Sequence, residues 1–277
     1  MIYIELMGGL GNQLFQIFCG ISYALENNLD FKIVKAKCDK VSPVDNKSLR
    51  PTYWENFFIN LSKFTCVNIN ILTYNEPIFT YNKIPYINKD FKLFGYYQSP
   101  KYFENYYKSI IEIIELDKQK AEIKEKYKEY FNDKVISLHF RIGDLKNNKG
   151  HGPVLNNKYY INAIKNILEK DNTCDTVLYF NEEQDNYIVE NMINNIKKSY
   201  PQLNFIQCSY EIEDWEQLLL MSCCYHNIIA NSTFSWWAAY FNSNSEKIIC
   251  YPNVWFGPKC NNSTRDLFPE NWNKIFI

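Results

Sequence analysis

Three side chains suited to binding a charged ligand stand close together in mid-chain: His139, Arg141 and Asp144. They lie at the carboxyl end of the apolar run 135–140, which predicts a buried strand, and Gly143 among them allows a sharp backbone turn. Open parallel sheets bind ligands outside the carboxyl ends of their strands. An arginine there presents a planar fork of donors that matches two phosphate oxygens. The alternative is a structural Arg141–Asp144 ion pair with His139 packed in the core.

A glycine-rich loop near the start of the chain is a second candidate. Met7-Gly8-Gly9-Leu10-Gly11-Asn12-Gln13 separates the apolar stretch 1–6 from the apolar positions of 14–25, which have helical spacing. A strand, a glycine loop and a helix present backbone N–H groups to a phosphate or a hydroxyl. A dinucleotide fingerprint would need a third glycine at Leu14, so a nicotinamide oxidoreductase is the least favoured function. A tight turn without a ligand is the alternative.

The third candidate is Asn231-Ser232-Thr233-Phe234, between a predicted strand and a predicted helix. Ser232 or Thr233 can cap the helix while its amides and hydroxyls face an anion. The alternative is a plain cap followed by packing of Trp236 and Trp237.

The elements that would position these loops alternate between strands and helices, which predicts βαβ units, a parallel sheet and an α/β fold. In the second half of the chain we expect strands at 135–140, 176–180, 204–208, 227–230 and 247–251, and helices at 158–170, 184–198, 214–224 and 234–241. In the first half we expect strands at 1–6, 32–35 and 91–99, with loops and short helices between the last two. A helix over 101–130 is expected to carry a solvated charged face after Leu116, and a domain boundary is expected near 133.

Composition limits the class of protein. Hydrophobic residues make up 46% of the 277 residues, which is enough for a packed core, and a net charge of −1 argues against nucleic acid or anionic lipid as a partner. The nine cysteines are scattered without a C-x-x-C pair, so we expect neither a zinc site nor a disulfide framework. With no signal peptide and no long apolar span in the sequence, we expect a cytoplasmic protein.

Taken together, the motifs resemble the inverting α-1,2-fucosyltransferases that use GDP-fucose, a family that includes blood-group H transferases and bacterial O-antigen and capsule enzymes. The stretches that carry the resemblance are spread over nearly the whole chain. They are Gly8 to Gln16, Gly95 to Phe103, His139 to Asp144, Tyr159-Tyr160, Leu220-Met221-Ser222, Asn231 to Tyr240, Pro252 and Trp255-Phe256.

The resemblance implies a GT-B architecture, in which two Rossmann-like domains face a cleft. Residues 1–133 would form the acceptor-side domain and 134–277 the domain that binds the GDP-sugar. The implied reaction transfers L-fucose from GDP-β-L-fucose to the 2-hydroxyl of a terminal β-galactoside. No metal is expected, and the chain has no D-x-D triplet to hold one.

The resemblance also implies roles for single residues. Arg141 would neutralise the β-phosphate, with Asp144 orienting it, and His139 would contact the sugar or the nucleoside. The remaining donor contacts would come from two groups: Asn231, Ser232, Thr233 and the Phe234 amide, and, closing from the opposite domain, Gly9, Gly11, Asn12 and Gln13.

Guanine recognition and the general base are less defined. Gln217 stands where the family often has a guanine-reading acid, and Glu216 or Asp214 would substitute for it. Candidate bases are Asp144, His139, His151 and Glu5, and a dissociative reaction would need little help from a base.

Two other functions stay open: transfer of another GDP-deoxyhexose such as rhamnose, and glycan binding without catalysis. The acceptor is expected to be an oligosaccharide held by the N-terminal domain and the segment 36–92. A lipid-linked acceptor would bring the protein to the membrane surface without a transmembrane segment.

Overall fold

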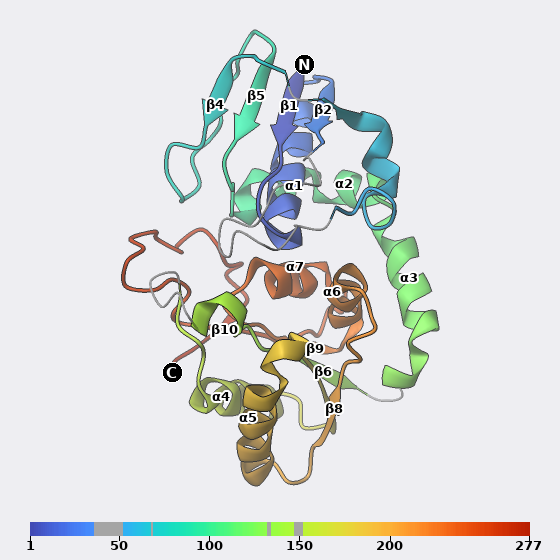
Figure 1. The fold of residues 1–277 in the computed structure, drawn as a ribbon, viewed down its shortest axis with the longest axis vertical. Coiled ribbons are helices and arrows are strands. Elements are labelled where there is room, and N and C mark those ends of the chain that lie inside the picture. Colours follow the sequence, from blue (N-terminus) through green and yellow to red (C-terminus); the bar gives the residue numbers. More distant parts are fainter. Residues whose placement is uncertain (36–51, 68, 132–133, 147–151) are drawn as a thin grey trace. The chain divides into compact units, whose positions relative to one another are not determined.

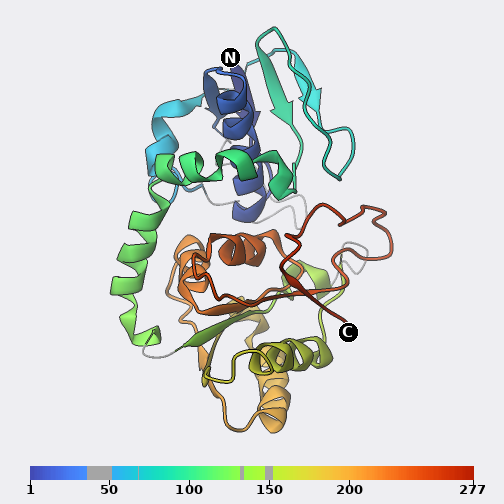
Figure 2. The ribbon, with the colours of Figure 1, turned by 180° about the vertical axis from the view of Figure 1, so that it is seen from behind.

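The computed structural model describes residues 1–35, 52–67, 69–131, 134–146 and 152–277, without the side chain of Asp144. The chain forms two compact units (Figures 1 and 2). Unit 1 comprises residues 1–119 and 262–269, and unit 2 comprises residues 120–261 and 270–277. The division therefore falls inside a helix and not at residue 133 as expected, and a short C-terminal segment belongs to unit 1.

Unit 1 contains a five-stranded parallel sheet in the order β3-β2-β1-β5-β4. Its elements are β1 (Ile2–Glu5), α1 (Leu10–Glu26), β2 (Phe31–Val34), β3 (Thr65–Cys66), β4 (Thr73–Asn75), β5 (Phe91–Phe94) and α2 (Tyr107–Ile113). Helix α1 packs closely on β1, since a Cβ on Gly20 would lie 2.3 Å from Ile4 Cδ1. Because β1 lies between β2 and β5, the loops that follow β1 and β5 are neighbours.

Unit 2 contains a six-stranded parallel sheet in the order β11-β10-β9-β6-β7-β8. Its strands are β6 (Val135–His139), β7 (Thr176–Phe180), β8 (Asn204–Gln207), β9 (His226–Ile228), β10 (Ile249–Pro252) and β11 (Asn273–Ile275). Helices α4 (Asn157–Leu168) and α5 (Asn186–Ser199) cover one face, and α6 (Asp214–Cys223) and α7 (Thr233–Phe241) cover the other (Figure 1).

The path of the chain through this second sheet creates a switch point. The chain runs outward from β6 to β8, returns to the other side of β6 and then runs outward from β9 to β11. The loops after β6 and β9 therefore leave the sheet on opposite sides of one crevice, the position where open α/β sheets bind ligands. The expected alternation of strands and helices is confirmed in this half of the chain.

The single helix expected over 101–130 is wrong. Two 3₁₀ turns, Pro100–Tyr102 and Glu104–Tyr106, precede α2, and Glu115 adopts a left-handed φ of 53° before α3 (Leu116–Lys126) begins. The buried positions explain the break. Ile110 and Ile114 lie on one helical face, whereas Leu116, Lys120 and Ile123 define another that a continuous helix would rotate away from the first.

The solvated charged face expected after Leu116 is confirmed, since the charged residues of α3 are exposed with one exception. Lys120 is buried, and its Nζ donates to the Phe241 carbonyl at 2.6 Å, at the C-terminal end of α7. A cation at a helix C-terminus is stabilised by the helix dipole and by the unpaired carbonyls there.

The cysteines of the described part are free thiols, and no helix in that part is long and apolar enough to cross a membrane.

Candidate functional site

The loops after β6 and β9 meet at the switch point of unit 2. Strands β6 and β7 end in register, with His139 opposite Phe180, and β9 flanks β6 on its other side. The His139 ring lies 5.7 Å from the Phe234 ring at the start of α7, measured between centroids. Two of the three candidate loops thus come together at one end of one sheet.

His139 is buried, and its Nδ1 has no hydrogen-bond partner. Burial, assisted by the nearby Arg141 charge, lowers the pKa of His139 to about 3. The imidazole is therefore neutral at physiological pH. An orphaned polar nitrogen inside a ligand-binding crevice is a group that a substrate hydroxyl or amide can satisfy.

Arg141 is oriented by a residue of the neighbouring strand's loop. Its Nη1 donates to Glu182 Oε1 at 2.6 Å, and Gln184 Nε2 donates to Glu182 Oε2 at 2.6 Å. Asp144 was expected to orient Arg141, but the side chain of Asp144 lies outside the described part. No sequence motif indicated that Glu182 has this role.

Gly143 and Asp185 fix the backbone beneath this ion pair. The Gly143 amide donates to Asp185 Oδ2 at 2.6 Å, and Asp185, fully buried, also forms an ion pair with Lys146. Gly143 has a φ of +26°, and a Cβ there would lie 3.1 Å from Glu182 Oε1. Glycine is favoured here because the positive φ would strain any other residue, whose Cβ would also press on the Arg141–Glu182 pair.

The segment before α7 forms a capped helix start. Ser232 Oγ accepts from the Phe234 amide at 3.3 Å, as the N-cap pattern predicted. Asn231 Nδ2 donates to the carbonyls of Pro153 and Trp255, while its buried Oδ1 has no partner. Thr233 is partly exposed at the first helical position, and Trp236 and Trp237 are fully buried in the packing expected of them.

The glycine loop of unit 1 is tied to the loop after β5. Gly8 has a φ of +77°, and the Gly9 carbonyl accepts from the amides of Asn12 and Gln13, which begins α1. Gln13 Nε2 donates to the Gly8 carbonyl at 3.1 Å, and Asn12 Oδ1 accepts from Gln98 Nε2 at 3.0 Å. Gly11 is buried in the first turn of α1.

Comparison with known protein families shows which family the chain belongs to. The sequence model of glycosyl transferase family 11 matches residues 36–276. The chain belongs to this family. It is therefore a glycosyltransferase.

Two relatives of this family 11 enzyme match nearly end to end. An alpha-1,2-colitosyltransferase of Escherichia coli is 28% identical over 300 residues, which cover 99% of each chain. The O-antigen biosynthesis glycosyltransferase WbnK of Escherichia coli is 28% identical over 312 residues, covering 98% of this chain and 99% of WbnK.

A solved structure shares the fold. The Arabidopsis thaliana FUT1 mutant R284K, in complex with GDP, aligns with a TM-score of 0.50 and 11% identity over 90% of this chain and 69% of that one. The expected α/β fold of GT-B type, with two Rossmann-like units, is confirmed.

Two acidic residues considered for the family 11 enzyme are already engaged elsewhere. Glu216 is buried, and its carboxylate accepts from Lys126 Nζ at 2.6 Å and from the Tyr127 hydroxyl at 2.7 Å. Glu5, considered as a base, pairs with Lys92 at 2.6 Å. Both carboxylates thus have partners within the protein, and the roles of Glu216 in reading guanine and of Glu5 as a base stay predictions.

Asp214 and Gln217 lie in the first turn of α6, and the side chain of each makes a hydrogen bond to a backbone group. Asp214 Oδ1 accepts from the Trp215 amide at 2.7 Å. Gln217 Nε2 donates to the Ile212 carbonyl at 2.8 Å, an orientation that leaves the amide oxygen as its acceptor toward other groups. His151 lies outside the described residues.

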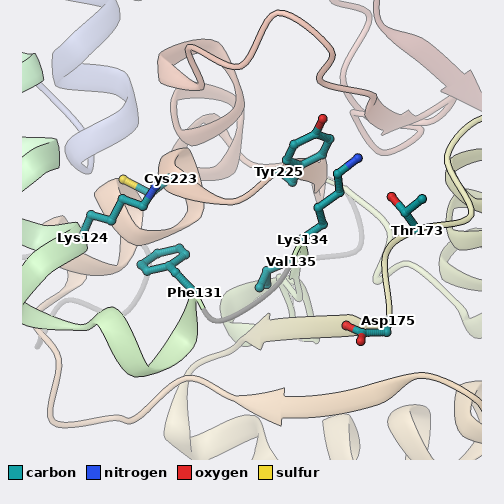
Figure 3. A pocket seen from close by; sticks show the side chains of 8 residues that line it. All are labelled: Lys124, Phe131, Lys134, Val135, Thr173, Asp175, Cys223 and Tyr225. Carbon is teal, nitrogen blue, oxygen red and sulfur yellow. The ribbon is translucent and has the colours of Figure 1, made fainter.

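A pocket of about 540 Å³ opens at the other end of the unit 2 sheet, where its strands begin (Figure 3). It is lined by Lys124, Phe131, Lys134, Val135, Thr173, Asp175, Cys223 and Tyr225. These residues lie before or at the amino ends of β6, β7 and β9, whereas Arg141 and Ser232 follow β6 and β9. The pocket is therefore separate from the family 11 candidate site.

Three possible metal ligands lie near the same end of the sheet. The ligand atoms of Asp171, Cys174 and His226 are within 4.8 Å of one another. The hydrogen bonds do not suit a metal. His226 Nδ1 accepts from the Ile248 amide at 2.9 Å, so the ring proton sits on Nε2 and faces Asp171 Oδ2 at 3.3 Å. Asp171 also pairs with Lys134 at 3.2 Å. The group is a hydrogen-bonded ion-pair network.

Proposed function

We propose that this glycosyltransferase moves a 6-deoxyhexose, L-fucose from GDP-β-L-fucose, onto the 2-hydroxyl of a terminal β-galactoside, with inversion and without a metal. The observation that carries the proposal is that the loop bearing Arg141 and the start of α7 meet at the unit 2 switch point, where the His139 and Phe234 rings lie 5.7 Å apart. A guanidinium and a helix N-terminus together suit a nucleotide diphosphate as it leaves.

In this proposal Arg141 stabilises the charge that develops on the β-phosphate as the bond from the anomeric carbon breaks. Ser232, Thr233 and the Phe234 amide bind the other phosphate oxygens, and Asn231 supports them. His139 supplies its unpaired Nδ1 to the donor. The unit 1 loop, with Gly9, Gly11, Asn12 and Gln13, contacts substrate.

Inversion requires the acceptor hydroxyl to attack the face of the anomeric carbon opposite GDP. His139 is a weak base because burial lowers its pKa to about 3. We therefore favour a dissociative reaction in which an oxocarbenium-like centre forms early and deprotonation of the acceptor comes late. Asp144 remains the proposed assistant to Arg141 or to the acceptor.

Colitose is the second candidate sugar, because one relative is named for transferring it. Colitose is fucose without the 3-hydroxyl. A site built to bind that hydroxyl discriminates against the analogue lacking it by about 10⁴-fold or more, whereas an apolar site discriminates far less. The other relative is named for O-antigen biosynthesis, which supports a glycan as the acceptor, and the terminal β-galactoside is the acceptor that the family resemblance implies.

The test is a donor panel of GDP-fucose, GDP-colitose, GDP-rhamnose and GDP-mannose with a β-galactoside acceptor, in EDTA and with added Mg²⁺. We expect transfer from GDP-fucose or GDP-colitose, equal rates in both buffers, and an α-1,2 linkage by NMR. Transfer only from another donor, or activity lost in EDTA, would overturn the proposal. Binding of the glycan with no turnover of any donor would favour the non-catalytic alternative.

A further inference from the structure

A single carboxylate holds the turn that follows β5 in unit 1. Glu76, directly after β4, accepts from the Tyr96 amide through Oε2 at 2.7 Å and from the Tyr97 amide through Oε1 at 3.1 Å. Glu76 reaches this position because β4 and β5 are paired, with its own amide donating to the Phe94 carbonyl at 2.9 Å. Two successive amides bound to one carboxylate fix the local backbone.

The backbone of this turn is strained. Tyr97 has a φ of +52°, a left-handed conformation that costs a residue with a Cβ about 1 kcal/mol or more. Its buried ring anchors the turn from below. Gly95 has no room for a side chain, since a Cβ there would lie 2.3 Å from Glu76 Cβ. Strained conformations that the surroundings enforce are typical of functional sites.

The turn is placed where a ligand of unit 1 would bind. It lies at the carboxyl end of β5, and Gln98 joins it to the glycine loop through Asn12 at 3.0 Å. Two aromatic side chains at this end of β5 are exposed, Phe94 at 39% and Tyr96 at 40%. An exposed aromatic ring on a rigid backbone is suited to stack on the apolar face of a sugar ring.

The local charge favours a neutral ligand. Glu76 brings a negative charge into the turn, and the nearby cation of Lys101 is paired with Asp266 at 2.6 Å. A nucleotide diphosphate would be repelled here, whereas an uncharged glycan would not.

We infer that Tyr96 forms a stacking platform for a pyranose ring of the acceptor glycan, and that Glu76 is a positioning residue that holds Tyr96 in place through the strained turn. This inference rests on the proposed function for the identity of the ligand as a glycan acceptor. It assigns the acceptor to a defined turn of unit 1 and gives Glu76 a role that no sequence motif indicated.

Kinetics with separate variation of donor and acceptor test the inference. We expect Tyr96→Ala to raise the acceptor KM about tenfold, as for the loss of an aromatic anchor, while the donor KM stays within about twofold. Tyr96→Phe keeps the ring and should keep the acceptor KM. Tyr86→Ala, which removes another exposed tyrosine of unit 1 at 63% exposure, is the matched control and should leave both values unchanged.

The role of Glu76 is tested by a double-mutant cycle. Glu76→Gln should raise the acceptor KM, and Glu76→Gln with Tyr96→Ala should be no worse than Tyr96→Ala alone, because Glu76 acts through Tyr96. Additive effects, or equal losses for donor and acceptor, would overturn the positioning role. Thermal melting shows whether Glu76→Gln is folded, and the Tyr96 variants test the platform if it is not.

Saturation-transfer NMR can measure the binding of methyl β-galactoside without any donor. This measurement separates the Tyr96 platform from the proposed transfer reaction. Binding to the wild type that is lost in Tyr96→Ala supports the platform even if every GDP-sugar fails in the transfer assay. Unchanged binding in Tyr96→Ala, or none to the wild type, overturns it.

Discussion

Arg141 and Glu182 follow two neighbouring strands, β6 and β7, and are joined by an ion pair with 2.6 Å between Nη1 and Oε1. The pair forms because β6 and β7 end at the same level of the sheet, so residues just beyond each strand meet. In the free enzyme Glu182 therefore sets the direction of the guanidinium that we assign to the donor phosphate.

Removing either partner should have different consequences. We expect Arg141→Ala to lower kcat by about 10²- to 10³-fold, as for loss of other groups that stabilise transition-state charge. Glu182→Gln should lower kcat about tenfold with little change in donor KM, because the guanidinium remains but its orientation loosens. Steady-state kinetics measure both, and Glu183→Gln, an exposed neighbour, is the control. A faster Glu182→Gln enzyme would mean that Glu182 competes with the phosphate for Arg141.

Asp185 should matter for folding as well as for the site. Asp185→Ala would leave the Gly143 amide and Lys146 without their buried acceptor, and we expect the free energy of unfolding to fall by about 1–3 kcal/mol. Urea denaturation measures this change, and Glu183→Ala should leave the midpoint unchanged. An equal midpoint for Asp185→Ala would show that water replaces the carboxylate.

The order of strands and helices in unit 2 could be predicted from the sequence because fully buried parallel strands such as 135–139 and 176–180 are short runs rich in apolar residues and do not alternate with charged ones. Strands β3, β4 and β11 were missed, since two or three residues carry no readable period. The break at Glu115 was missed because it depends on which face each segment buries, and that is a property of the tertiary structure.

For the candidate site, sequence motifs predicted the loops but not their partners. Arg141 and Ser232 could be singled out by residue type and position. Glu182 and Glu76 could not, because each acts on a loop of another strand and the pairing depends on strand register. The partners of Glu216 could not be predicted for a similar reason: nothing local indicates that Lys126 and Tyr127 contact α6.

Acid should destabilise the enzyme in part through His139. Its native pKa is about 3, against about 6.5 unfolded, so below pH 6.5 the unfolded chain binds a proton that the native state does not. The contribution of His139 to the free energy of unfolding is therefore fully present above pH 6.5. It is lost as the pH falls toward 3, at up to about 1.4 kcal/mol per pH unit. Urea denaturation at several pH values in this range should show that the free energy of unfolding falls less steeply with pH in His139→Gln than in the wild type. His226, whose pKa burial also lowers, contributes equally to both proteins. Identical slopes would mean that His139 is protonated in the native state.

Glu216 and Gln217 are adjacent in α6 but should respond oppositely to substitution. Glu216→Gln weakens the contacts with Lys126 and Tyr127, and we expect it to lower the free energy of unfolding by about 1 kcal/mol while the Kd for GDP is unchanged. Gln217→Ala removes the amide oxygen proposed to face guanine. It should weaken GDP binding about fivefold, the equivalent of one neutral hydrogen bond, with little loss of stability.

Calorimetric titration with GDP and urea denaturation separate the effects of the two substitutions. ADP, which lacks the guanine donors, should bind wild type and Gln217→Ala alike. If Glu216→Gln instead weakened GDP and spared ADP, guanine recognition would belong to Glu216 and its contacts with Lys126 and Tyr127 would have to open when GDP binds.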